Sequence, residues 1–140
     1  MSKNFSAADL LLRAGISVGL AVSGYLHADL YAHGYRYIHL IGPSFLLQAA
    51  ASFALALVLL LGPWTLRVAA ALLAVGALTA FVLSRTTGLF GFSEIGWQPT
   101  PQAALSVIAE ATTLVLCVVS LLMLRQRIAE PANAMHESPV

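Results

Sequence analysis

Charged side chains are scarce in this 140-residue sequence. Lys, Arg, Asp and Glu together make up 9% of it, whereas about a quarter of the residues in a soluble domain are charged. The seven Lys and Arg residues are spread along the chain, and the formal net charge is +1. Because nucleic-acid binding needs clustered positive charge, the composition excludes a nucleic-acid-binding protein and does not fit a soluble domain.

Cysteine is nearly absent as well. Cys117 is the only cysteine, so it cannot form an internal disulfide, and no CxxC motif or Cys/His pair accompanies it. We interpret Cys117 as a small apolar core residue. The sequence also has no nucleotide-binding loop and no recognisable pair of nucleophile and base. These absences favour a protein that is not an enzyme.

Hydrophobic residues, in contrast, make up 59% of the chain, and its mean hydropathy is +0.86. Because roughly 20 apolar residues are needed to cross about 30 Å of hydrocarbon, we searched for runs of that length between polar or Gly/Pro breaks. Four runs qualify: residues 8–29, 44–62, 66–84 and 102–124. They predict an all-α membrane protein, a bundle of four transmembrane helices that forms one domain over residues 1–128.

Both ends of this domain carry further signals. Ser6 is followed three residues later by Asp9, the spacing of a capping box with Asp in place of Glu, which predicts the start of the first helix. Residues 129–140 have no apolar periodicity and include Pro, Asn, Glu and Ser. We expect this C-terminal tail to be disordered.

An even number of spans places both termini on the same side of the membrane. Two basic residues, Arg36 and Arg85, flank the spans on the side of the two longer loops. The terminal side has more of them: Lys3, Arg13, Arg67, Arg125 and Arg127. The positive-inside rule therefore predicts a multi-pass protein of the bacterial inner (cytoplasmic) membrane, with cytoplasmic termini and outward-facing long loops. Arg13 lies inside the first span, and we expect its side chain to snorkel to the inner interface.

Small and polar residues recur at helical spacing in every predicted span. The four stripes are Gly15, Gly19, Ser23 and His27; Ser44, Gln48 and Ser52; Gly76, Ala80 and Ser84; and Gln102, Ser106, Glu110, Thr113, Cys117 and Ser120. Close packing of small residues and interhelical hydrogen bonds hold membrane helices together, so we expect these stripes to face one another.

Glu110 is the most unusual member of these stripes, because it lies about two turns inside the fourth span. An ionised, unpaired carboxyl at that depth costs a few kcal/mol. Two interpretations follow. Glu110 donates an interhelical hydrogen bond to Gln48 or a Ser hydroxyl, or it takes part in binding or proton transfer.

The first outer segment, residues 25–43, contains all four Tyr and three of the four His. An aromatic belt at the level of the lipid headgroups explains the Tyr. His27, His33 and His39 are six residues apart, whereas two ligands on one helical face need a spacing of three or four. Zinc, copper and haem are therefore weaker hypotheses, and we predict no metal ligand.

The second outer segment, residues 85–101, is rich in Gly and aromatic residues. We expect it to lie on the membrane surface or to fold over the mouth of the bundle. Its Arg85 and Glu94 are suited to pair with Asp29 and Arg36 of the first outer segment, so surface ion pairs between the two loops are predicted.

Two stretches of the sequence are similar to those of other small membrane proteins. The run from His27 to Gln48, with Gly34-Tyr35-Arg36-Tyr37-Ile38 and Ile41-Gly42-Pro43, resembles a pattern in small uncharacterised four-helix integral membrane proteins of actinobacteria. Phe92-Ser93-Glu94, and the run from Pro101 to Glu110, are similar to the same group. The four-span layout resembles the DoxX-like proteins in outline. The resemblance implies a fold and an actinobacterial lineage, and it implies no activity or cofactor.

Three functions remain open. The first is a non-enzymatic accessory or assembly subunit of a larger membrane complex, with the lipid bilayer and other membrane subunits or further copies of the chain as partners. The alternative is a binder or carrier of a lipid, quinone or cation with an outward pocket. A membrane enzyme with Glu110 or a His as acid or base is the least favoured. The candidate ligand-binding residues are His27, Asp29, Arg36, Gln48, Arg85, Glu94 and Glu110.

Overall fold

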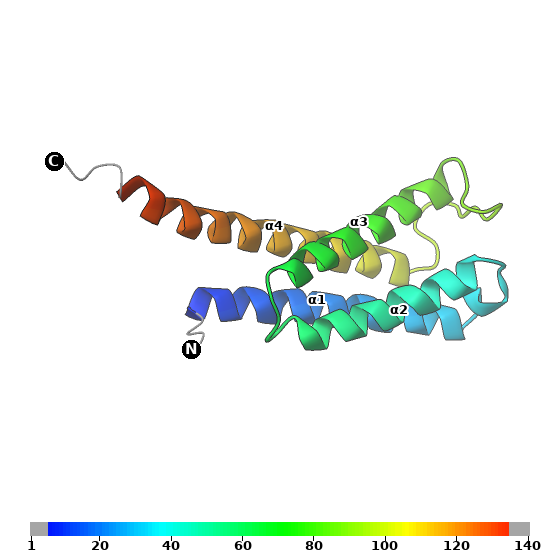
Figure 1. The fold of residues 1–140 in the computed structure, drawn as a ribbon. Coiled ribbons are helices and arrows are strands. Elements are labelled where there is room, and N and C mark those ends of the chain that lie inside the picture. Colours follow the sequence, from blue (N-terminus) through cyan, green and yellow to red (C-terminus); the bar gives the residue numbers. More distant parts are fainter. Residues whose placement is uncertain (1–5, 135–140) are drawn as a thin grey trace.

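The structure, a computed structural model, describes residues 6–134, and side chains from residue 6 to residue 127. Within that range it contains four α-helices, one 3-10 turn and no strand. These elements are α1 (Ala7–Ala32), η1 (Tyr35–Tyr37), α2 (Ile41–Val58), α3 (Thr65–Arg85) and α4 (Gln102–Ala134) (Figure 1). All four α-helices of the described chain are long and apolar enough to cross a membrane. The predicted all-α, four-span fold class is therefore confirmed.

The helix boundaries differ from the predicted ones by three residues or more at four places, the first of which is the end of α1, at Ala32 rather than residue 29. α2 begins at Ile41, so Pro43 lies inside its first turn; Pro is tolerated there because the first N–H groups of a helix have no partner within it. α2 also ends earlier than predicted, at Val58. α4 continues to Ala134, so the first part of the predicted disordered tail is helical, whereas residues 135–140 lie outside the described range.

The helices run alternately up and down the bundle. α1 packs against α2 and α4, and α3 packs against α4. Both termini and the short α2–α3 turn lie at one end, here called the terminal end, and the α1–α2 and α3–α4 loops lie at the other, here called the loop end (Figure 1). From the short turn, α2 and α3 diverge toward the loop end (Figure 1).

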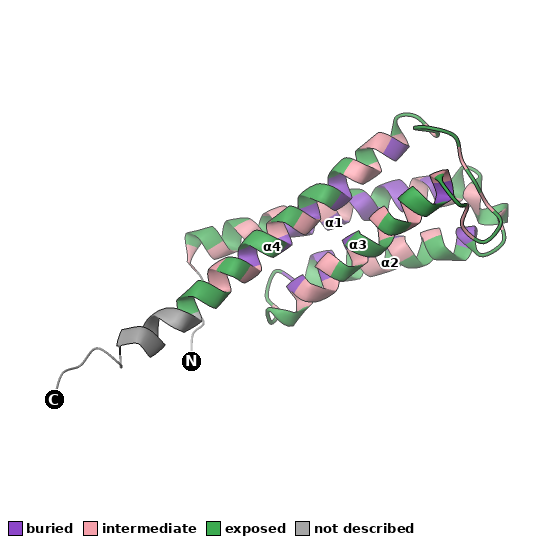
Figure 2. Ribbon diagram, turned by 90° about the horizontal axis from the view of Figure 1, so that it is seen from above, coloured by how far each residue is buried: buried purple, intermediate pink, exposed green. Residues whose placement is uncertain are grey.

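Most buried positions face neighbouring helices, and the outward surface is largely exposed (Figure 2). The exposed side chains include many large apolar ones, such as Leu11, Leu57 and Leu61. A soluble protein rarely leaves so much contiguous apolar surface in water, so this surface indicates a lipid environment. The core cluster of the described residues consists of Ile16, Leu20, Ala56, Leu59, Ala70 and Cys117.

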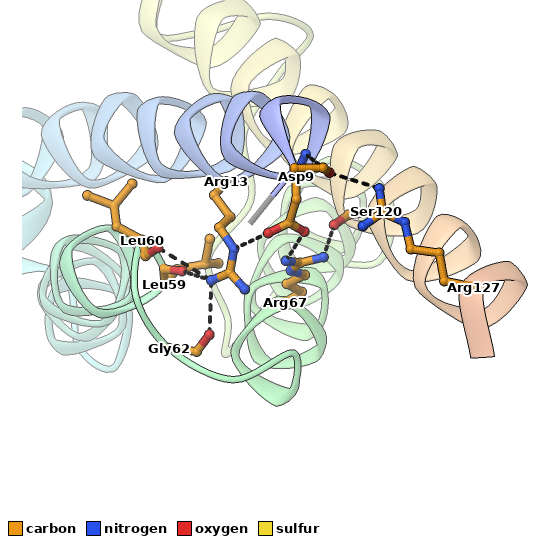
Figure 3. A network of polar contacts seen from close by, with 9 residues as sticks. Asp9, Arg13, Leu59, Leu60, Gly62, Arg67, Ser120 and Arg127 are labelled. Atoms are coloured by element: carbon orange, nitrogen blue, oxygen red, sulfur yellow. Dashed lines mark hydrogen bonds and ion pairs between the residues drawn. The ribbon is translucent and has the colours of Figure 1, made fainter. Parts of the chain in front are cut away.

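An ion-pair network joins the helices at the terminal end (Figure 3). The carboxylate of Asp9 on α1 accepts from Arg13 Nε at 2.7 Å and from Arg67 Nη2 on α3 at 2.5 Å. Arg67 Nη1 also donates to the Ser120 hydroxyl of α4. The side chain of Ser6 accepts from the Asp9 N–H at 3.3 Å, so the predicted N-cap is present, while the carboxylate of Asp9 turns inward to the two arginines.

Arg13 completes this network and corrects one prediction. It is 5% exposed, and its Nη1 donates to the carbonyls of Leu59 at 2.7 Å and Gly62 at 2.9 Å, at and just beyond the end of α2. The prediction that Arg13 snorkels to the interface was therefore wrong. The carbonyls at a helix C-terminus have no partner within the helix and carry partial negative charge, so they attract a guanidinium.

We predict that Asp9→Asn lowers the free energy of unfolding by about 3 kcal/mol, because removal of one partner leaves two buried guanidinium groups without their anion. The measurement is reversible unfolding in mixed detergent micelles, followed by circular dichroism. Asp29→Asn is the matched control, because Asp29 pairs with the exposed His33 at 3.0 Å and should change stability by less than about 1 kcal/mol. Equal losses in the two variants would contradict the role given to Asp9.

Candidate functional site

A cavity of about 300 Å³ lies at the loop end, and all four α-helices and both long loops contribute to its wall. Most of its side chains are apolar, and a few polar ones are placed among them. The lining residues are His27, Leu30, Tyr35, Ile41, Ser44, Phe45, Leu47, Gln48, Leu73, Gly76, Ala77, Ala80, Phe81, Ser84, Arg85, Leu89, Phe92, Glu94, Pro99, Ala103 and Ser106. An apolar cavity with a few fixed polar groups is the usual form of a small-molecule site.

His27 forms part of the wall from α1. Its Nδ1 lies 2.9 Å from the Ser23 carbonyl one turn earlier, and its ring centroid lies 5.1 Å from that of Phe45. A carbonyl only accepts, so Nδ1 carries the proton and, in the neutral ring, Nε2 keeps a lone pair. Nε2 has no hydrogen-bond partner among the described residues. His27 therefore offers an acceptor for a ligand.

Glu110 lies behind the cavity wall. It is 2% exposed, and its Oε1 accepts from the Ser23 hydroxyl of α1 and from Gln48 Nε2 of α2 at 3.2 Å. Gln48 lines the cavity and Glu110 does not. The predicted interhelical partners of Glu110, Gln48 and a Ser hydroxyl, are thus confirmed, but the predicted direction was wrong, because Glu110 accepts both hydrogen bonds. Glu110 positions Gln48, whose amide oxygen has no partner in the described part of the chain.

The two long loops meet at the mouth of the cavity. The Tyr35 hydroxyl donates to the Glu94 carboxylate. The Tyr35 ring stacks on the Phe45 ring, with centroids 4.8 Å apart, and makes an edge contact with the Phe92 ring, with centroids 5.9 Å apart. Burial, followed by the hydrogen bond to Glu94, raises the pKa of Tyr35 above the usual value for tyrosine. The phenol therefore keeps its proton and serves as the donor that joins the loops.

Arg85 holds the α3–α4 loop in place. Its Nη2 lies 3.0 Å from Glu94 Oε2 and 2.6 Å from the Gln98 carbonyl, and its Nε donates to the Gly96 carbonyl at 2.9 Å. The guanidinium also lies over the Phe81 ring, 3.7 Å from its centroid. The charge of Arg85 is thus matched by Glu94, and most of its donors are used by the loop itself.

Besides Glu110, two further predicted site residues lie outside the cavity wall. Asp29 pairs with His33 at 3.0 Å, Arg36 donates to the Tyr37 hydroxyl at 2.5 Å, and neither Asp29 nor Arg36 lines the cavity. The predicted ion pairs between the loops were therefore wrong. The α3–α4 loop folds back on itself, so Arg85 meets Glu94 of its own loop, and Tyr35 makes the link instead.

The stripe of small residues on α3 faces the other helices across the cavity. α3 buries Arg67, Ala70, Ala74 and Ser84, and Gly76, Ala80 and Ser84 line the cavity. A Cβ on Gly76 would meet no atom within 4 Å. The stripe therefore leaves space for the cavity, and small residues at helical spacing were the signal that pointed to this face.

No three His, Cys, Asp or Glu side chains of the described residues lie close enough together to hold a metal ion. No protein-family model, curated protein or solved structure matches the chain. The resemblance to actinobacterial four-helix membrane proteins therefore stays a prediction. The function has to be inferred from the cavity and its lining.

We predict that Tyr35 ionises at higher pH than a free tyrosine, because burial and the neighbouring Glu94 carboxylate both disfavour a phenolate. Just above the ordinary tyrosine pKa, Tyr35 ionises in the unfolded chain but stays protonated in the folded one. The free energy of unfolding therefore falls as the pH rises from the ordinary tyrosine pKa toward the raised pKa of Tyr35. Absorbance titration should show a late ionisation step that Tyr35→Phe removes and Tyr37→Phe, at an exposed site, leaves intact. A late step that survives Tyr35→Phe would refute the assignment.

Proposed function

We propose that this protein binds an uncharged, largely apolar small molecule with one or two hydrogen-bonding groups, such as a quinone, in the loop-end cavity. The observation that carries the proposal is the cavity itself, about 300 Å³ in volume, with mostly apolar walls and paired charges. Of the ligands predicted from the sequence, namely lipid, quinone and cation, this wall suits an uncharged one best.

The charge balance of the wall supports this choice. Arg85 and Glu94 line the cavity as an ion pair at 3.0 Å, so together they present no net charge. The remaining polar groups include the imidazole of His27 and the amide of Gln48, which can hydrogen-bond to a carbonyl or hydroxyl. A charged ligand would lose its hydration without gaining a free counter-charge.

The size and the position of the cavity support a lipid-like ligand. Sites for small molecules have volumes of roughly 300–1,000 Å³, so this cavity accommodates one ring-sized head group. Leu47 lines the cavity and is also 69% exposed on α2, so the cavity reaches the apolar outer surface of the bundle. An isoprenoid or acyl tail would leave by this route and lie among the lipids.

In this proposal the loop end faces the outer side of a bacterial inner membrane, because Arg13, Arg67, Arg125 and Arg127 lie at the terminal end. The hypothesis of an accessory subunit stays a prediction. The exposed apolar side chains at the loop end, including Ile95 and Trp97, serve equally well as membrane anchors, so they do not favour a protein partner. The cavity favours the binder.

We expect a short-chain ubiquinone analogue to quench the fluorescence of Trp97 saturably in a Trp64→Phe background. Trp97 packs on Phe81 with ring centroids 5.5 Å apart, and Phe81 lines the cavity, so a bound quinone lies within quenching distance. The background substitution removes the other of the two tryptophans. Linear quenching without saturation would show only partition into the micelle and would contradict the proposal.

Gly76→Leu, made in the same background, tests whether the quinone occupies the cavity. The new side chain enters open space, and the change from Gly to Leu favours the helix, so the variant folds while part of the cavity is filled. We expect quinone affinity to fall about tenfold. Val75→Leu on the same helix is the control, because Val75 is exposed and does not line the cavity. Unchanged binding by Gly76→Leu would refute the site.

A further inference from the structure

The ion-pair network at the terminal end has an excess of positive charge. Arg13, Arg67 and Arg127 lie there, and among the side chains that the structure describes (residues 6–127) the one carboxylate beside them is that of Asp9 (Figure 3). Arg13 is held by Asp9 and by the carbonyls that follow α2. The excess therefore falls on Arg67 and Arg127, which both line a small cavity between α1, α3 and α4. Arg127 Nη2 donates to the neutral Ser6 hydroxyl at 2.8 Å, which leaves its charge unmatched there.

One N–H group of the Arg67 guanidinium has no hydrogen-bond acceptor among the described residues. Its side chain is 3% exposed; Nη1 donates to Ser120 and Nη2 to Asp9, but Nε is buried without a hydrogen-bond partner among the described residues. Nearly all buried polar groups in proteins are hydrogen-bonded. An unpaired N–H on a buried guanidinium therefore indicates a missing acceptor, and the positive excess indicates that this acceptor is anionic.

The cavity beside Arg67 is lined by both polar and apolar side chains. It has a volume of about 20 Å³, and Asp9, Arg67, Ser120 and Arg127 form its polar side. Its aliphatic side consists of Leu12, Met123 and Leu124. This volume takes one oxygen atom rather than a whole ligand, so the rest of the anion would remain at the mouth, beside the exposed Arg127.

We propose that the small cavity beside Arg67 and its mouth, together called the groove here, bind the phosphate group of an anionic phospholipid. One phosphate oxygen occupies the small cavity and accepts from Arg67, Arg127 pairs with a second oxygen, and an acyl chain lies against Leu124. Arginine is well suited to phosphate because its planar fork matches two oxygens. A lipid fits better than free phosphate because the aliphatic side chains border the groove where the apolar part of α4, Gln102–Arg127, ends.

Native mass spectrometry of the full-length protein, released from micelles that contain equal phosphatidylglycerol and phosphatidylcholine, tests this proposal. We expect the wild type to retain phosphatidylglycerol in about tenfold preference, and Arg127→Gln to lose most of it. Arg125→Gln is the matched control, because Arg125 is exposed at the same end, carries the same charge and does not line the groove. Its preference should stay within about twofold of the wild type.

Arg67→Lys is a second variant, and it keeps the buried charge while removing the fork. We expect it to fold and to lose preference for phosphatidylglycerol, as Arg127→Gln does. Equal losses in Arg125→Gln and Arg127→Gln would show a general charge effect and overturn the site. Absence of any preference in the wild type would mean that the cavity holds only water. Displacement of phosphatidylglycerol by excess inorganic phosphate would show that the groove binds a free anion, and it would contradict the proposal of a lipid ligand.

Discussion

The bundle depends on the two ion pairs that Asp9 makes with Arg13 and Arg67. Through them and the hydrogen bonds of the same arginines to Leu59 and Ser120, a single carboxylate connects α1, α2, α3 and α4. Lipid is as apolar as Leu, so apolar contacts alone do little to associate helices in a membrane. A fixed network at the terminal end leaves α2 and α3 free to diverge toward the loop end, where the larger cavity lies.

A second carboxylate organises the other half of the bundle in a different way. Glu110 accepts from Ser23 and Gln48, so it joins α1, α2 and α4 with neutral donors rather than with cations. The core cluster, to which Ile16 and Leu20 belong, lies between the two polar groups along α1. The layer between the ion-pair network and Glu110 is thus largely apolar, with the buried hydroxyls of Ser17 and Thr113 within it.

The candidate site was only partly predictable. His27, Gln48, Arg85 and Glu94 do line the cavity, because each lies near the end of a span or in a loop at the same side, which helical spacing already indicates. Asp29, just two residues after His27, does not, since a rotation of two residues turns a side chain to a different helical face. Glu110 was recognised as unusual, but its place behind Gln48 depends on the packing of α1 against α2 and α4.

The sequence by itself determined the number of spans, the helical faces that turn inward and the end at which the long loops meet, because length, hydropathy and helical periodicity are local properties. The tertiary structure decided which polar groups meet. Arg13 reaches the carbonyls after α2 and Tyr35 reaches Glu94, and the two members of each pair are far apart in the chain. Since such partners are set by how helices and loops come together in space, neither composition nor spacing could identify them.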